Sequence, residues 1–132
     1  MNHTPVLSYR KTIKEDWPLI LTEEKKLAKN PYYYAFTDDV SFAKYMQHSF
    51  VFTLLVDNTF AGYCSYKMID NKTAELNGMV VVPAVQGIGL SKYAIKILFE
   101  KMKHDTKIKT IILTVHPKNS KAQVIYCLLD AQ

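Results

Sequence analysis

The sequence predicts one α/β domain in which helices flank a mixed, mainly antiparallel sheet, and three observations support this fold class. Strand-like runs rich in Phe, Val, Leu and Tyr follow one another over residues 49–82, with only tight turns between them. After Pro83 the apolar period changes from two to 3.6, which indicates a helix. Residues 110–115 then form a short, continuous apolar run, as expected for a strand in the centre of a sheet.

The first third of the chain is predicted to hold one strand and two helices. Residues 6–12 suggest the strand, and residues 14–29 are helical because apolar side chains recur among Glu and Lys. Asn30-Pro31 ends this helix. The sequence Thr37-Asp38-Asp39 provides an N-cap and an acidic first turn for a second helix, which runs to about His48.

The remaining chain is predicted to form a three-stranded antiparallel meander, a helix, a strand and a last helix. Asp57-Asn58 and Asp70-Asn71 are typical turn sequences. They separate strands at residues 49–57, 59–69 and 73–82. The helix that follows has an apolar face made by Leu90, Tyr93, Ala94, Ile97, Leu98 and Met102. Pro117 precedes the last predicted helix, which covers residues 118–129.

Length and composition indicate a single domain spanning residues 1–132, because a chain with 48% hydrophobic residues can bury a sizeable core. No run reaches the roughly 18 apolar residues of a membrane span, and no apolar signal segment follows Met1. Cys64 and Cys127 lie in a strand pattern and a helix pattern. We interpret both as reduced packing residues of a cytoplasmic protein, rather than disulfide or metal ligands.

The strongest chemical signal is the turn Gln86-Gly87-Ile88-Gly89-Leu90-Ser91, between the last strand of the meander and the helix. Its two glycines let the backbone approach a ligand closely, because no Cβ intervenes. The helix N-terminus adds N–H donors and partial positive charge, to which the Gln86 amide and Lys92 can contribute. The turn therefore suits a diphosphate held without metal. An ordinary strand-to-helix turn is the alternative.

In its context this turn resembles the acyl-CoA site of the GNAT superfamily of N-acetyltransferases. The family pattern is an apolar strand, often Val-x-x-Pro, followed by Gln/Arg-x-x-Gly-x-Gly/Ala. This chain has Val81-Val82-Pro83-Ala84-Val85-Gln86-Gly87-Ile88-Gly89-Leu90-Ser91. Ser91 replaces the usual Gly or Ala, and Gln86 replaces the commoner Arg, which removes one positive charge. A dinucleotide-binding Rossmann turn is disfavoured, because this turn follows an antiparallel meander.

The resemblance implies a GNAT-like fold, acetyl-CoA as the co-substrate and no metal. In the family, backbone groups near residues 79–81 pair with the pantetheine arm, one N–H polarises the thioester carbonyl, and this strand splays from its neighbour. Gly78 fits a bulge or a close backbone approach there. The residues implied to bind the cofactor are Met79, Val80, Val81, Gln86, Gly87, Ile88, Gly89, Leu90, Ser91, Lys92 and Asn119.

A second family feature is Asn119-x-x-Ala122-x-x-x-Tyr126, whose ends share one face of a helix. The resemblance gives Asn119 a hydrogen bond to the pantetheine arm. It makes Tyr126 the general acid for the leaving thiolate, because a phenol with a pKa of about 10 stays protonated at neutral pH. The alternative is that Tyr126 packs in the core.

The incoming ammonium group must lose a proton before it attacks the acyl carbon, and three residues are candidates for this step. Glu75 leads, because many relatives carry a Glu near this position. Asn77, on the same strand face, could hold a water instead. His116 follows the next strand and titrates near neutrality. An exposed strand carboxylate and a residue at a loop edge are the simpler interpretations of Glu75 and His116.

The acceptor is expected to be a primary amine, carried by a small molecule or a peptide. Tyr32-Tyr33-Tyr34-Ala35-Phe36 lies in a region that often borders the acceptor site in this superfamily. An aromatic lip there could recognise an amine or an apolar group. Aromatic packing at a helix corner explains the same run equally well.

Relatives usually continue past the helix that carries Tyr126 into a Gly-Phe turn and two more strands, whereas this sequence closes at Gln132. The domain is therefore expected to be short at its C-terminus. Its strand at residues 110–115 would be an exposed apolar edge, so a homodimer paired through that edge is predicted.

Two other classes of function stay open. One is a non-catalytic acyl-CoA-binding domain, or a truncated GNAT paralogue that needs a partner to complete its sheet. The other is a basic module that binds nucleic acid, since the net charge is +5. The basic residues are dispersed, however, and coenzyme A is an equally good reason for surplus Lys. The sequence therefore favours acetyl transfer, with no membrane and no nucleic acid as partners.

Overall fold

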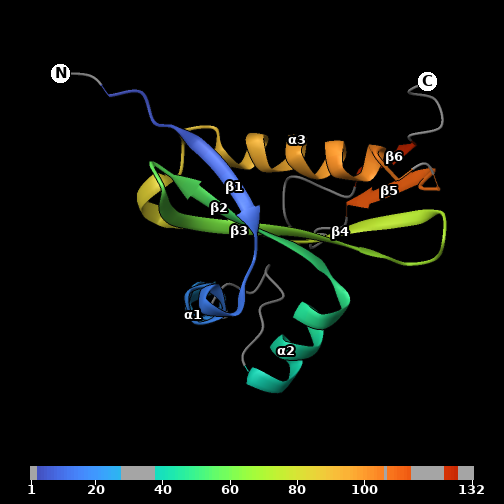
Figure 1. Cartoon of the computed structure of the whole chain (residues 1–132), viewed down its shortest axis with the longest axis horizontal. Helices are drawn as coiled ribbons and strands as arrows, with labels where there is room; N and C mark the ends of the chain where they lie inside the picture. Colours follow the sequence, from blue (N-terminus) through green and yellow to red (C-terminus); the bar gives the residue numbers. More distant parts are fainter. Residues whose placement is uncertain (1–2, 28–37, 106, 114–123, 128–132) are drawn as a thin grey trace.

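The architecture of the chain is described by a computed structural model, which covers residues 3–27, 38–105, 107–113 and 124–127 (Figure 1). The strands are β1 (Leu7–Lys11), β2 (Phe50–Val56), β3 (Thr59–Met68), β4 (Thr73–Val81), β5 (Thr110–Leu113) and β6 (Val124–Cys127). The helices are α1 (Trp17–Leu27), α2 (Asp39–His48) and α3 (Leu90–Lys103), with short 3-10 turns η1 (Lys14–Asp16) and η2 (Pro83–Val85).

All six strands belong to one sheet, in the order β1-β2-β3-β4-β5-β6. Neighbouring strands are antiparallel except β4 and β5, which run parallel. The parallel step is possible because α3 connects these two strands and crosses over the sheet. The predicted α/β fold with a mixed, mainly antiparallel sheet is thereby confirmed.

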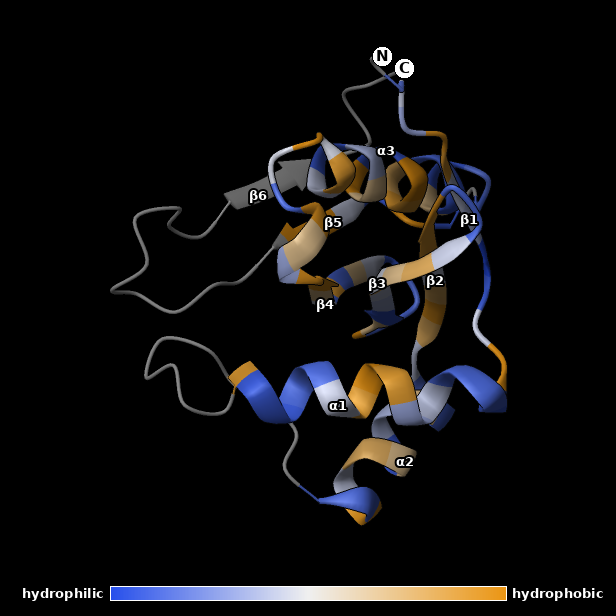
Figure 2. Ribbon diagram, turned by 90° about the vertical axis from the view of Figure 1, so that its left-hand side faces the viewer, coloured by the Kyte–Doolittle hydropathy of each residue, from blue (hydrophilic) through white to orange (hydrophobic). Residues whose placement is uncertain are grey.

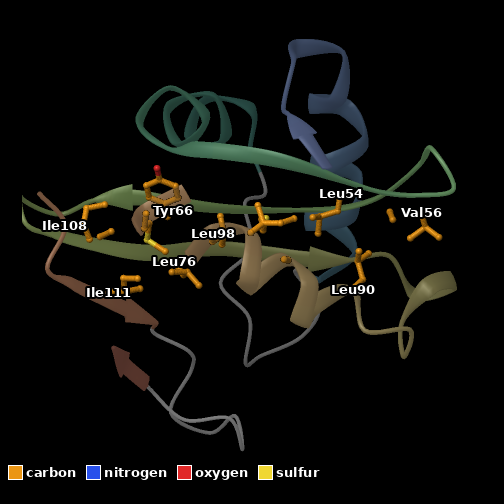
Figure 3. Packing of buried hydrophobic residues seen from close by; sticks show 14 residues of the cluster. Leu54, Val56, Tyr66, Leu76, Leu90, Leu98, Ile108 and Ile111 are labelled. Atoms are coloured by element: carbon orange, nitrogen blue, oxygen red, sulfur yellow. The ribbon is translucent and has the colours of Figure 1, made fainter. Parts of the chain in front are cut away.

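The helices cover both faces of the sheet. Helix α3 lies on one face, and α1 and α2 lie on the other (Figures 1 and 2). Under α3 the core is a single apolar cluster, of which Figure 3 shows the side chains. A smaller cluster under α1 and α2 contains Ile20, Phe42, Val51, Tyr63 and Val80. None of the described helices is long and apolar enough to cross a membrane.

Local sequence explains the turns between these elements. Asp57 and Asn58 take positive φ angles of 50° and 64°, as a two-residue hairpin between β2 and β3 requires. The Asp70 carboxylate accepts hydrogen bonds from two backbone N–H groups in the next turn. Asp38 caps α2, and its side chain accepts from the Ser41 N–H at 2.7 Å. These are the turns and the cap that the sequence predicts.

A β-bulge interrupts β4 at Asn77. Gly78 lies opposite Ser65 of β3 and Leu76 lies opposite Tyr66, so Asn77 is the extra residue. On its other side β4 pairs with β5 from Thr73 to Leu76, which lies opposite Leu113, the last described residue of β5. The predicted splay of β4 beyond this point concerns residues outside the described structure and stays a prediction.

The prediction of a C-terminal helix over residues 118–129 is wrong for residues 124–127, the part of this range that the structure describes. Residues 124–127 form β6, which pairs antiparallel with β5 along all four of its residues. The segment Val124-Ile125-Tyr126-Cys127 is rich in β-branched and aromatic residues, which favour a strand. Because β6 covers β5, that strand is not the free edge from which self-association was expected.

Candidate active site

A groove lies at the end of β4, where the chain turns into α3. Its volume is about 760 Å³. It is lined by Leu27 of α1, by the end of β4, and by the turn and first residues of α3: Met79, Val80, Val81, Val85, Gln86, Gly87, Gly89, Leu90, Ser91, Lys92 and Ile95. The structure therefore brings together nine of the ten cofactor-binding residues that the sequence predicts on β4 and the turn. Ile88, the tenth, is 38% exposed and is not part of the lining.

The turn is shaped by two glycines in the left-handed region. Gly87 and Gly89 have φ angles of 88° and 87°, and Gly89 is the N-cap residue of α3. A Cβ built on either glycine would meet no atom within 4 Å. The glycines are therefore required by the backbone conformation and not by crowding, and the space in front of them is open to a ligand.

Backbone N–H groups are the main polar feature of this turn. Within the described chain, the N–H groups from Gly87 to Lys92 donate to no protein acceptor, and Tyr93 is the first whose N–H bonds back, to Gly89 O at 3.0 Å. The N-terminus of a helix also carries partial positive charge. Gln86 turns back to the strand and donates from Nε2 to Val81 O at 3.3 Å. The arrangement fits a phosphate group.

Glu75, the predicted base, lies on β4 before the bulge. Its neighbours Ala74 and Leu76 enter the core under α3, so its side chain belongs to the opposite face. The Glu75 side chain is 25% exposed, and its Oε1 lies 3.6 Å from Nζ of Lys67 on β3. Asn77, the predicted alternative, already holds two protein partners: its Oδ1 accepts from Ser65 Oγ at 2.7 Å, and its Nδ2 donates to Ser49 Oγ at 2.9 Å.

The remaining predicted site residues are not brought into the groove by the described structure. Asn119, His116 and the aromatic run at residues 32–36 lie outside the described residues. Tyr126 is placed by its backbone on β6, opposite Ile111 of β5. The prediction that Asn119 and Tyr126 share a helix face therefore fails for Tyr126, because its segment is a strand.

Sequence reasoning missed a polar cluster on the α1 and α2 side of β4. Glu24 of α1 is only 1% exposed and accepts a hydrogen bond from the Tyr63 hydroxyl. Tyr45 of α2 is hydrogen-bonded to Ser65. One signal was available: Glu24 shares a helix face with Ile20 and Leu27, so a charged residue stands in an apolar stripe. We name Glu24, Tyr63, Tyr45, Ser65, Asn77 and Ser49 the bulge network.

Burial also controls the ionisation of this region. It raises the pKa of Tyr45 far above the ordinary value, and the nearby Glu24 carboxylate raises it further, so Tyr45 keeps its proton. Burial raises the pKa of the Cys64 thiol to about 12. The structure thus agrees with the interpretation of Cys64 as a packing residue. No group of three or more His, Cys, Asp or Glu suited to a metal ion occurs among the described residues.

A second groove of about 880 Å³ lies at the other end of the sheet, between β1, β2 and η1. Phe50 is 51% exposed there and stacks on Tyr66, with ring centroids 4.8 Å apart. Three lysines also line this groove: Lys11, Lys14 and Lys101. It shares no lining residue with the groove at α3.

Comparison with known proteins agrees with the fold. The model of the Acetyltransferase (GNAT) family matches residues 10–127, and the chain belongs to this family. No curated protein matches the chain.

Solved structures of GNAT acetyltransferases are similar in fold at low sequence identity. Ribosomal-protein-alanine N-acetyltransferase from Brucella melitensis has a TM-score of 0.72 and 16% identity, over 86% of this chain and 77% of that one. PaiA N-acetyltransferase from Thermoplasma acidophilum, in complex with coenzyme A, has a TM-score of 0.63 and 18% identity, over 88% and 83%.

N-acetylglutamate synthase from Neisseria gonorrhoeae, complexed with coenzyme A and N-acetyl-glutamate, has a TM-score of 0.70 and 16% identity. The match covers 82% of this chain but only 25% of that protein. Coenzyme A or acetyl-CoA is present in several of the similar structures.

Proposed function

We propose that this protein transfers an acetyl group from acetyl-CoA to a primary amine by direct attack. The observation that carries the proposal is the groove in which the open N–H groups of the turn adjoin the end of β4. A diphosphate and a pantetheine arm need a turn with N–H donors and a strand backbone in this order. Membership of the GNAT family supports the same reaction class.

In this proposal the turn binds the pyrophosphate and β4 binds the pantetheine arm. Donors come from the backbone between Gly87 and Ser91, and Lys92 adds positive charge. The side of β4 from Met79 to Val81 that faces away from β3 offers backbone groups to the arm. One N–H there polarises the thioester carbonyl, which stabilises the negative charge that develops on its oxygen. Asn119 adds a hydrogen bond to the arm.

The chemistry then needs one proton acceptor and one proton donor. Glu75 takes the proton from the ammonium group, and the free amine attacks the acetyl carbon. The new C–N bond forms as the C–S bond breaks, and Tyr126 gives a proton to the leaving thiolate. The nitrogen then loses its second proton to solvent, and Tyr126 regains a proton from solvent. The Tyr126→Phe variant should lower kcat about 100- to 10,000-fold and leave acetyl-CoA affinity nearly unchanged, because the hydroxyl acts only in the transition state.

The acceptor is proposed to be an amine of a small molecule or a peptide. Similar structures include enzymes for both kinds of substrate: N-acetylglutamate synthase, and an acetyltransferase that modifies the N-terminal serine of ribosomal protein L7/L12. A screen of amino acids, polyamines and peptides for thiol release from acetyl-CoA would identify the class. Tight binding of acetyl-CoA without thiol release would favour a non-catalytic acyl-CoA-binding domain instead.

Ligand-induced stabilisation tests the binding site directly. Acetyl-CoA at 100 times its Kd should raise the free energy of unfolding by roughly 2.7 kcal/mol. Gly89→Glu should abolish this effect, because it places bulk and negative charge where the pyrophosphate is proposed to bind. Gln47→Glu, which adds the same charge on an exposed part of α2, is the control. If millimolar acetyl-CoA left the thermal unfolding of the wild type unchanged, the proposed function would be lost.

A further inference from the structure

The bulge network lies directly behind the part of β4 to which acetyl-CoA is proposed to bind. Its members come from four elements and from the residue that links α2 to β2, and its centre is deeply buried. Glu24 and Tyr63 are each 1% exposed, and Ser65 is fully buried. A buried carboxylate and buried hydroxyl groups cost free energy unless they are hydrogen-bonded, so such a cluster needs a reason.

Hydrogen bonds join the members of the network in two groups. Tyr63 donates to Glu24. Tyr45 is hydrogen-bonded to Ser65, and Ser65 donates to Asn77 Oδ1. This second group ends at Ser49, just after α2, whose Oγ accepts from Asn77 Nδ2. Asn77, the extra residue of the bulge, is therefore held between β3 and the end of α2.

The backbone of β4 also touches the network at Gly78. A Cβ at this position would collide with the Tyr45 hydroxyl oxygen, and it would lie 2.7 Å from Ser65 Oγ and 3.0 Å from Tyr63 Cε2. Gly78 has no positive φ angle, so contact with these side chains, and not backbone strain, requires glycine here. The Tyr45 hydroxyl thus rests against the residue that follows the bulge.

We propose that Tyr45 is a positioning residue for acetyl transfer, which holds the bulge at Asn77 and Gly78 and so fixes the direction of the β4 backbone from Met79 onward. This inference rests on the proposed function. The bulge follows the last described pair between β4 and β5, Leu76 and Leu113, and the N–H proposed to polarise the thioester lies just beyond the bulge. Because a hydrogen bond to a developing oxyanion depends on its direction, a small rotation of this backbone would reduce catalysis.

Tyr45→Phe is the direct test, since it removes one hydroxyl and keeps the ring. The probe is acetyl-CoA labelled with carbon-13 at the carbonyl, and the readouts are its Kd and the infrared carbonyl band of the bound form. We expect a Kd within about twofold of wild type, a carbonyl band shifted back toward that of free acetyl-CoA, and thiol release slower by about tenfold or more. Tyr66→Phe, which removes a hydroxyl on the other face of the sheet, is the matched control.

The outcomes separate this inference from the proposed function. If wild-type protein does not bind acetyl-CoA, the proposed function fails and the inference fails with it. If wild type binds and polarises the carbonyl, and Tyr45→Phe gives the same band and the same rate, only the inference is overturned. A loss of stability alone, with an unchanged band, would assign Tyr45 a purely structural role.

A second variant tests whether the Tyr45 hydroxyl contacts Gly78. Gly78→Ala should disturb the bulge and return the carbonyl band toward its free position. In the Tyr45→Phe background, Gly78→Ala should lower the unfolding midpoint by less than it does in the wild type. The reason is that the colliding oxygen is gone, and of the three contacts only those with Ser65 and Tyr63 remain. Additive effects of the two substitutions would contradict the proposed contact.

Discussion

The two faces of β4 are stabilised by different kinds of interaction. Toward α3 the strand presents Ala74 and Leu76, which are buried in an apolar cluster. Toward α1 and α2, from the bulge onward, it meets the buried Tyr63–Glu24 pair and a hydrogen-bonded path from Tyr45 to Ser49. Apolar burial is not directional, so it holds the strand in place but does not orient single backbone groups. Hydrogen bonds are directional, and we infer that they orient the bulge.

The largest effect on stability is expected on the apolar face. Leu98 of α3 is completely buried in the cluster, so Leu98→Ala should lower the free energy of unfolding by about 2–5 kcal/mol through lost burial and a cavity. Leu19→Ala on α1, where the side chain is 47% exposed, is the control. Urea denaturation measures both. If Leu98→Ala lowered the free energy of unfolding as little as the control does, the packing of α3 on the core would not be a main source of stability.

A smaller but pH-dependent effect is expected at Asp16 on the other face. Its carboxylate accepts from Arg10 at 2.6 and 2.7 Å, from Thr53 Oγ1 at 2.9 Å and from the Ile13 N–H at 3.1 Å. Burial by itself would raise the pKa of Asp16, but these hydrogen bonds outweigh it and hold the pKa below its usual range. Because the folded-state pKa is lowered, the stabilisation is present above the unfolded pKa of about 3.9 and is lost as pH falls through the folded pKa.

Asp16→Asn should therefore cost about 1.5–3 kcal/mol at pH 7, and the gap to wild type should narrow as the pH falls below about 4. Asp39→Asn at the exposed start of α2 removes the same charge and serves as the control. Unfolding in urea at pH 7, 5 and 3 gives the comparison. A gap that stayed constant over this range would show that the charge of Asp16 is not what stabilises the face.

The bulge network should respond to the loss of a single hydroxyl. Tyr63 is 1% exposed, so Tyr63→Phe keeps its packing and removes the hydroxyl that donates to Glu24. The expected cost is about 1–3 kcal/mol, because a buried carboxylate oxygen loses that hydrogen bond. Urea denaturation of Tyr63→Phe beside Tyr66→Phe measures it. Equal stability of the two variants would indicate that Glu24 does not depend on this donor.

The sequence predicted well those features that depend on neighbouring residues. Strands β1 to β5, the hairpin at Asp57 and the cap at Asp38 were predicted because each depends on a few neighbouring residues. The turn at Gly87 and Gly89 was found for the same reason, since its function lies in backbone geometry that glycine reveals. Nine of the ten ligand-binding residues expected on β4 and this turn line one groove.

What the sequence did not predict depends on contacts between distant segments. Glu24, Tyr45 and Asn77 meet only after α1 and α2 pack on the sheet, and no local pattern joins them. The segment around Tyr126 was predicted as a helix from its spacing to Asn119, but pairing with β5 made it a strand. The sheet partner outweighed the helical spacing, because β5 offers a row of backbone groups that only another strand can satisfy.

The smallest effect on stability is expected at the turn, where a substitution changes only the backbone strain. Gly89 has a φ angle of 87° with open space around it, so Gly89→Ala should cost only the strain of a left-handed alanine, about 1 kcal/mol. Gly89→Asn should cost less than Gly89→Ala, because asparagine tolerates this conformation better. Both variants should nonetheless weaken acetyl-CoA binding in a titration, since their side chains enter the space proposed for the pyrophosphate. If Gly89→Ala were as stable as wild type and bound acetyl-CoA equally well, neither the left-handed cap nor the close approach of the backbone would be essential to the site.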